Sequence, residues 1–194
     1  MQLAEFATTD CTGLVLAHRQ NFVGSSLAKG TVLTDQHVAA LIAAGVEKLV
    51  CARPDHSDIH EDDAAARLAS LLSPKNLDFS MAATGRVNIK VRQQGLIRYD
   101  REVIRKINEI DERITFALVQ HNQLLTAGQM AATLKIIPFF VPETSLQKIE
   151  DLVANSPAFS FRPLRQARVA LIQTRIDGQP DRLFAATENV TAAR

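Results

Sequence analysis

The chain has 194 residues, enough for one ordinary domain or two small lobes. Hydrophobic residues make up 46% and charged residues 22%, which is typical of a folded globular protein and excludes a disordered one. The 22 Lys and Arg residues nearly balance the 21 Asp and Glu residues, so no overall field would attract nucleic acid or an anionic membrane.

The remaining global features favour a reducing compartment. The longest apolar stretch, residues 136–141, is far shorter than the roughly 18 residues that cross a bilayer. The first residues lack the basic and apolar regions of a secretion signal, and Cys11 and Cys51 are too few for a disulfide framework. We therefore expect a cytoplasmic protein whose partners include neither nucleic acid nor a membrane.

The first segment, residues 1–85, has 6 basic and 10 acidic side chains and a mixed pattern of elements. Thr34 is a suitable N-cap for a helix that Gly45 would end. A second helix should end before Pro74, with Asp58 as its N-cap and Glu61 as the capping-box partner. The elements predicted here are strands at 13–18, 22–26 and 46–52 and a helix at 59–72.

The second segment, residues 86–153, opens with the alternation of a half-buried strand at 87–92. Gln94-Gly95 should turn this strand into a hairpin with 96–99, and Asp100 should cap the following helix. The other elements predicted are strands at 114–119 and 130–141 and a helix at 146–153 with Thr144-Ser-Leu-Gln147 as a capping box. Residues 86–141 carry 9 basic and 5 acidic side chains, so they should face either the acidic first segment or an anionic ligand.

The C-terminal part of the sequence predicts a linker at 154–167 and then an apolar strand at Val169–Ile172. This strand resembles the first strand of an α/β domain, and only 22 residues follow it. The prediction is therefore an α+β fold with four main helices in two α/β lobes, 1–85 and 86–153. The linker and the first strand of a truncated α/β domain, 168–194, would follow.

The densest group of candidate metal ligands is Asp55, His56, Asp58 and the run from His60 to Asp63. His56 and His60 are four residues apart, as in a helical metal pair, but the HExxH order is absent. Helix capping by Asp58 explains the acids more simply, so we predict no metal here.

Two further places could hold an anion. Lys135 interrupts an otherwise apolar strand, although alternation would place it on the solvent side of that strand. Thr84, Gly85, Arg86 and Asn88 could form a small polar site, although a simple turn explains them as well. The basic stretch from Arg86 to Arg113 has interleaved acids and one aromatic residue, Tyr99, which does not favour a nucleic-acid surface.

Several short motifs, in order along the chain, resemble proteins of molybdenum-cofactor biosynthesis, in particular a bacterial molybdopterin-binding protein of the molybdopterin molybdotransferase (gephyrin-like) superfamily. The matching pieces are Gly13-Leu-Val-Leu-Ala-His18, Lys29-Gly-Thr-Val-Leu-Thr34, Ala44-Gly45-Val46, His60-Glu-Asp-Asp-Ala-Ala65, Thr84-Gly-Arg-Val-Asn88, Ala127-Gly-Gln-Met130, Lys135-Ile-Ile-Pro138 and Arg168-Val-Ala-Leu-Ile-Gln-Thr174.

The resemblance implies that molybdopterin binds the full-length protein, mostly beyond residue 194, and that this chain alone is non-catalytic and does not hold it. Within the chain it implies cofactor contacts at Thr174 and Arg175, the turn after the first strand of the binding domain. That turn reads Thr174-Arg-Ile-Asp177 and not Thr-Gly-Asp-Glu, so we do not expect molybdate insertion. A positioning role, with a homodimer allowed, is the expected function.

Two alternatives remain. The glycine-punctuated strands before Leu33-Thr-Asp-Gln-His-Val38, and again Leu125-Thr-Ala-Gly-Gln-Met130, resemble β-clip modules that bind a sugar or sugar acid. A metal hydrolase built on His56, His60 and the nearby carboxylates is a third reading.

Overall fold

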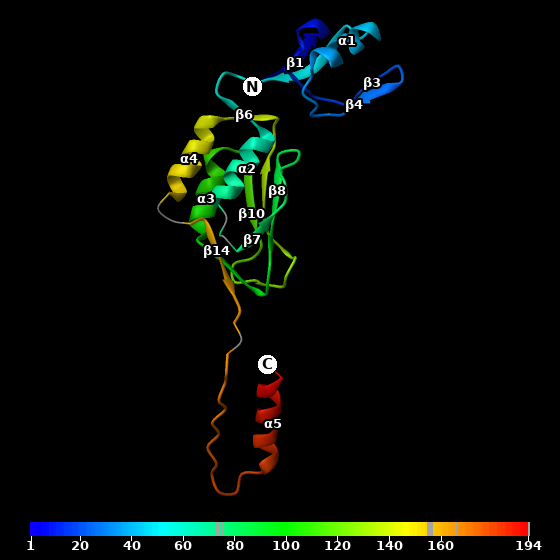
Figure 1. The fold of residues 1–194 in the computed structure, drawn as a ribbon. Helices are drawn as coiled ribbons and strands as arrows, with labels where there is room; N and C mark the ends of the chain where they lie inside the picture. Colours follow the sequence, from blue (N-terminus) through cyan, green and yellow to red (C-terminus); the bar gives the residue numbers. More distant parts are fainter. Residues whose placement is uncertain (73, 75, 155–156, 166, 194) are drawn as a thin grey trace. The chain divides into compact units, whose positions relative to one another are not determined.

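The computed structural model describes residues 1–72, 74, 76–154, 157–165 and 167–193 (Figure 1). The chain forms two units, Met1–Pro163 and Leu164–Arg194. Several small antiparallel sheets and five helices make up the described residues, which confirms the predicted α+β class. No described helix is long and apolar enough to cross a membrane.

The first 53 residues build a small sheet with its own core. Its strands are β1 (Gln2–Ala7), β2 (Val15–Leu16) and β5 (Lys48–Arg53) in the order β1-β5-β2; a hairpin of β3 (Gln20–Phe22) and β4 (Ser25–Leu27), the 3-10 helix η1 (Thr8–Asp10) and the helix α1 (Asp35–Ala43) complete it. The Thr34 side chain accepts a hydrogen bond from His37 N–H, and Gly45 has φ +76°, so both predicted ends of α1 are confirmed.

Cys11 and Cys51 lie in this N-terminal core. Both side chains are fully buried, and their Sγ atoms are 3.9 Å apart. Burial raises the pKa of the Cys51 thiol to about 12. The two thiols therefore act as small apolar core groups rather than as nucleophiles.

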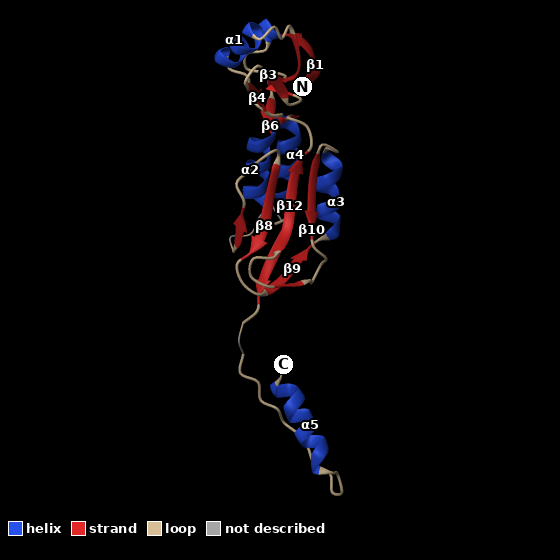
Figure 2. Ribbon diagram, turned by 90° about the vertical axis from the view of Figure 1, so that its right-hand side faces the viewer, coloured by secondary structure: helices blue, strands red, loops and turns tan. Residues whose placement is uncertain are grey.

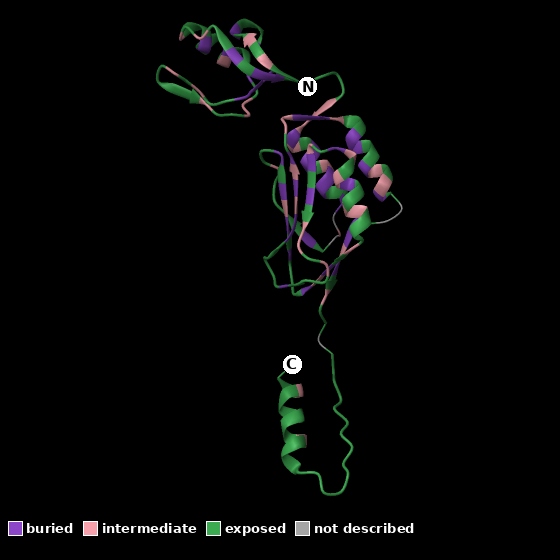
Figure 3. Cartoon of the chain, turned by 180° about the vertical axis from the view of Figure 1, so that it is seen from behind, coloured by how far each residue is buried: buried purple, intermediate pink, exposed green. Residues whose placement is uncertain are grey.

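Residues 58–153 form the second and larger core. A four-stranded sheet in the order β10-β12-β8-β7 has the helices α2, α3 and α4 on one face (Figures 2 and 3). The bounds are α2 (Glu61–Leu72), β7 (Leu77–Phe79), β8 (Arg86–Val91), α3 (Arg101–Ile110), β10 (Ile114–Leu118), β12 (Met130–Ile136) and α4 (Glu143–Val153). Apolar residues of the sheet, such as Ile89 and Leu134, are buried under the helices, while Lys90 and Lys135 are on the other face. The predicted placement of Lys135 is thus confirmed.

Two further groups of strands close this core. One is a sheet in the order β11-β9-β14, and the other is the pair β13-β6. The bounds are β6 (Asp58–His60), β9 (Gly95–Tyr99), β11 (Leu124–Leu125), β13 (Phe140–Pro142) and β14 (Phe159–Pro163). Phe159 and Phe161 of β14 are buried in the same core as α2 and β8.

Several local predictions are wrong. Asp58 lies in β6 and not at a helix N-cap, because residues 58–60 pair with β13 and α2 begins only at Glu61. Strand β9 pairs with β11 and β14, so the predicted hairpin with β8 does not form. The capping box at Thr144 is also absent, since α4 begins after Pro142 without a side-chain cap.

Long-range pairing accounts for two more differences. The predicted strand at 130–141 divides into β12 and β13, with Ile137 to Phe139 between them. The structure has β14 inside the range predicted as a linker, residues 154–167, and it pairs β7 with β8 across the predicted boundary at 85/86. The part of that range at 155–156 and 166 lies outside the described residues.

The second unit contains one helix, α5 (Asp181–Ala192). The strand predicted at Val169–Ile172 does not form, and Val169 and Ile172 are 78% and 88% exposed. A strand needs a neighbouring strand to hydrogen-bond its backbone, and none of the described residues pairs with this segment. Helix α5 was not predicted from the sequence.

Candidate functional site

A cavity of about 370 Å³ brings together residues from four separate places in the sequence. It lies where α2 begins, beside the turn before β8 and the segment that joins β12 to β13. Its lining consists of Lys29, Gly30, Glu61, Thr84, Lys135, Ile137, Pro138 and Phe139. Three of these eight residues are ionisable, namely two lysines and one glutamate.

Backbone contacts fix Glu61 at the cavity. Strand β6 pairs with β13 up to His60 and Phe140, and Glu61 N–H then donates to Phe139 O at 2.8 Å. The chain turns from strand to helix at this residue, so the Glu61 side chain enters the junction between the two elements. It is only 8% exposed, and no described residue donates a hydrogen bond to its carboxylate.

The surroundings of Glu61 raise the pKa of its carboxyl group. Burial raises the pKa of this carboxyl, and the neighbouring charge of Asp62 raises it further. The nearby His60 ring and the ammonium groups of Lys29 and Lys135 lower this pKa but do not cancel the effect. The carboxyl group can therefore accept a hydrogen bond or exchange a proton with a molecule in the cavity.

The turn at Thr84–Gly85 closes the cavity in a conformation that a non-glycine residue rarely adopts. Thr84 has φ +50° and Gly85 has φ +69°. Gly85 N–H donates to Asp62 Oδ1 at 2.8 Å, and Ile136 N–H donates to Gly85 O at 2.7 Å. A Cβ at residue 85 would lie 2.6 Å from Glu61 Oε2 and would also meet the carbonyl oxygen of Ile136. Only glycine lets the turn approach Glu61 this closely.

His60, the residue before Glu61, carries an unused polar atom. Its Nδ1 accepts a hydrogen bond from Asp62 N–H at 3.3 Å, and its ring packs edge-on against Phe140. Its Nε2 is buried and has no hydrogen-bond partner within the described part of the chain. Because Nδ1 is the acceptor, Nε2 holds the proton of the neutral ring and is an unpaired buried donor.

The structure separates the residues proposed as metal ligands. His56 is exposed in a loop, and His60 lies in β6, so the two do not share a helix face. Asp58 Oδ2 instead binds the N-terminal amine of Met1 at 2.7 Å and accepts a hydrogen bond from Asp55 N–H. Among the described residues, no three His, Cys, Asp or Glu side chains are grouped as metal ligands.

The proposed cofactor contacts Thr174 and Arg175 lie in the second unit, in irregular backbone before α5. The Arg175 guanidinium pairs with Asp181 at 2.8 Å and lies over the Phe184 ring, 4.6 Å from its centroid. Arg175 is thus engaged with its own unit.

The sequence singled out two of the eight lining residues, Thr84 and Lys135, as separate candidates for an anion, and the structure brings them together. It missed Lys29 as a cavity residue and took Glu61 for a capping residue, because pairing between β6 and β13 is not visible in local sequence. The useful local signal was Lys135, which interrupts an otherwise apolar strand.

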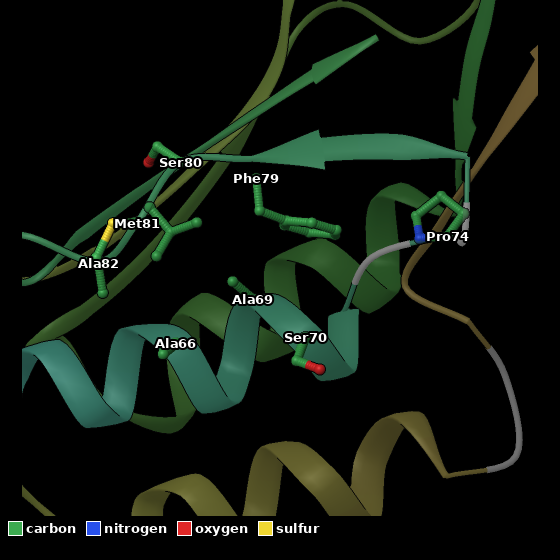
Figure 4. A pocket seen from close by; sticks show the side chains of 9 residues that line it. Ala66, Ala69, Ser70, Pro74, Phe79, Ser80, Met81 and Ala82 are labelled. Atoms are coloured by element: carbon green, nitrogen blue, oxygen red, sulfur yellow. The ribbon is translucent and has the colours of Figure 1, made fainter. Parts of the chain in front are cut away.

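A second, apolar hollow lies between α2 and β7 (Figure 4). Figure 4 shows the Phe79 ring above the helix surface formed by Ala69 and Ser70. Met81, at one end, is 90% exposed. The lining contains no titratable side chain among the described residues, so this hollow offers packing area but no acid–base chemistry.

We compared the chain with protein-family models, with curated proteins and with solved structures, and none of the three comparisons gave a match.

Proposed function

We propose that residues 1–163 form a non-catalytic ligand-binding module for a small phosphorylated ring compound, and that the ligand is molybdopterin. The buried Glu61 carboxyl, which lacks a donor among the described residues and shares a cavity with Lys29 and Lys135, carries this proposal. A largely buried carboxylate that receives no hydrogen bond is costly to keep, and this cost appears as the raised pKa of Glu61. A ligand that donates a hydrogen bond to the Glu61 carboxyl group would explain why this residue lies in the cavity.

The chemistry of molybdopterin matches the lining. Its phosphate is an anion that the ammonium groups of Lys29 and Lys135 would bind. Its pterin ring has amino and N–H groups that would donate hydrogen bonds to the Glu61 carboxylate. Phe139 adds an aromatic ring beside Lys29, whose Nζ lies 5.4 Å from the ring centroid. An aromatic ring can pack against a flat ligand. The ammonium groups, the carboxyl group and the aromatic ring all line one cavity of small-molecule size.

The resemblance described above supports the same ligand class, because it was drawn from motifs that include Lys29-Gly-Thr, His60-Glu-Asp, Thr84-Gly-Arg and Lys135-Ile-Ile. Each of these four motifs contributes at least one residue to the cavity. The proposal differs from the expectation that the ligand lies mostly beyond residue 194. It places a contact surface for the pterin within the chain.

An anaerobic fluorescence titration of the chain with molybdopterin tests the proposal. Glu61→Gln and Lys135→Gln should each weaken binding about tenfold or more, because each removes a charged hydrogen-bonding partner. Lys90→Gln is the matched control, since Lys90 is an exposed lysine on the same sheet and does not line the cavity. The proposal would be overturned if Glu61→Gln and Lys135→Gln left molybdopterin binding unchanged and Arg175→Gln abolished it. That result would place the site at Thr174 and Arg175.

A sugar acid is the second candidate for this cavity. Its carboxylate would bind the lysines and its hydroxyl groups would donate to Glu61. The same variants separate the two ligands, with galacturonate as the probe. Saturable binding of galacturonate that Lys135→Gln weakens, with no binding of molybdopterin, would favour the β-clip reading.

A further inference from the structure

We propose a second binding site, independent of the first, that holds a phosphate monoester where β9 passes into α3. A cavity of about 400 Å³ lies there, lined by Arg98, Tyr99, Asp100, His121, Pro157, Phe159, Ser160 and Arg162. It shares no residue with the cavity at Glu61.

Strand pairing places the two arginines on one face. In the antiparallel pair of β9 and β14, Arg98 is opposite Ser160, and Arg162 is two residues further along β14. Alternate residues of a strand share a face, so Arg98, Ser160 and Arg162 lie together on the side away from the core. The other side of the pair is buried, with Ile97 and Phe159 in the core.

Neither guanidinium is used elsewhere in the structure. Arg98 and Arg162 are exposed, and neither has an ion-pair or hydrogen-bond partner among residues 1–72, 74, 76–154, 157–165 and 167–193. The Ser160 hydroxyl donates to the Arg98 carbonyl oxygen at 3.4 Å, so its one proton is already used. Two planar guanidinium groups at one hollow match the oxygens of a phosphate.

The acidic residue in the lining offsets one of the two arginines and leaves a net positive charge. Asp100 Oδ1 accepts the Glu102 N–H at 2.8 Å and caps α3, which holds this carboxylate at the start of the helix. The lining also includes Tyr99 and His121, whose rings are in edge contact, with centroids 5.3 Å apart. These rings give the organic part of an ester a surface to contact, which inorganic phosphate cannot use.

The size and charge of the site favour a small ligand over a polyanion. Two free arginines over a cavity of this volume match one phosphate group, whereas nucleic acid needs a longer basic track or several stacking rings. The net charge of the whole chain is +1, so no wider field assists a polyanion.

Amide chemical shifts in a titration of the full chain with phenyl phosphate and with inorganic phosphate test this inference. Both should shift residues 98–101 and 159–162 saturably, with phenyl phosphate the tighter ligand. Arg98→Gln and Arg162→Gln should each weaken phenyl phosphate binding about tenfold or more, and Arg98→Lys should weaken it less. The exposed Arg19→Gln, which removes the same charge elsewhere, should change it less than twofold, and a circular-dichroism melt checks that each variant is folded.

Three outcomes would contradict the proposal. One is binding that is unchanged in folded Arg98→Gln and Arg162→Gln, and another is the absence of saturable shifts with either probe. The third is tighter binding of a single-stranded RNA or of phosphatidic acid vesicles than of phenyl phosphate, which would assign the arginines to a larger partner. Glu61→Gln should leave phenyl phosphate shifts at residues 98–101 unchanged, so failure here and failure of the proposed function are distinguishable.

Discussion

Two carboxylates in this molecule, Asp111 and Glu61, are equally buried and have opposite surroundings. Each is 8% exposed. Asp111, between α3 and β10, accepts hydrogen bonds from the Arg113 guanidinium at 2.8 Å and from Ser145 Oγ of α4 at 2.6 Å. Glu61, at the start of α2, has no such donor among the described residues.

The pKa values of the two groups follow this difference. Burial alone would raise the pKa of Asp111, but the hydrogen bonds of Arg113 and Ser145 outweigh it and lower that pKa to about 2. Burial raises the pKa of Glu61, and nothing among its neighbours reverses the shift. Asp111 therefore links α3, β10 and α4 through its hydrogen bonds, whereas the Glu61 carboxyl group can still accept a hydrogen bond at the cavity. Two carboxylates with the same exposure thus have different roles, because the donors around them differ.

The largest expected change in stability tests whether the Thr84–Gly85 turn packs closely against Glu61. Gly85→Ala should lower the free energy of unfolding by roughly 3 kcal/mol, because a positive φ strains alanine and its Cβ would overlap Glu61 and β12. Urea denaturation measures the change. Gly24→Ala is the control, since Gly24 also has positive φ but its Cβ would meet no atom within 4 Å. A loss in Gly85→Ala no larger than in Gly24→Ala would show that the turn is not packed against Glu61.

The second effect concerns Asp111. Asp111→Asn should lower the free energy of unfolding by roughly 2 kcal/mol at neutral pH, the value that corresponds to a pKa lowered from 3.8 to about 2. A carboxyl whose pKa is lower in the folded state stabilises the protein above its unfolded pKa, and this stability is lost as the pH falls from about 4 to about 2. The difference between parent and variant should shrink over that range in urea denaturation curves. A constant difference down to pH 2 would exclude the ionised Asp111–Arg113 pair as its source.

Helix ends were predicted correctly where they depend only on residues nearby in the sequence. The Thr34 cap and Gly45 stop of α1 and the Asp100 cap of α3 need only residues within one or two turns, and the structure confirms them. The alternation of Val87, Ile89 and Val91 also needs only one buried face.

Features that depend on distant pairing were missed. Asp58 was predicted as a helix cap because its sequence fits one, but pairing with β13, more than 80 residues away, holds it in a strand. The composition of residues 159–163, with Pro163 and Arg162, is typical of a linker, yet Phe159 and Phe161 fill the core beside β9. The cavity at Glu61 has the same origin, because Lys29, Thr84 and Lys135 meet only after the sheets form.

The smallest effect has the opposite sign and separates Glu61 most directly from Asp111. Glu61→Gln should raise the free energy of unfolding at pH 7 by about 1 kcal/mol, because it removes a buried charge that lacks donors. A carboxyl whose pKa is raised by folding contributes fully to stability below its unfolded pKa and loses that contribution as the pH rises through its folded pKa. The advantage of Glu61→Gln should therefore vanish below about pH 4, near the ordinary pKa of glutamate.

Thermal melts of the parent and of Glu61→Gln from pH 4 to pH 8 measure this, with Glu47→Gln, an exposed glutamate in the N-terminal sheet region, as the control. The control should show no such pH-dependent gain. If Glu61→Gln destabilised the protein at pH 7 as Asp111→Asn does, Glu61 would be a structural carboxylate with donors of its own. A variant that is more stable but no longer binds molybdopterin would instead show that the chain keeps this costly charge for its ligand, since a purely structural residue would not lose binding while gaining stability.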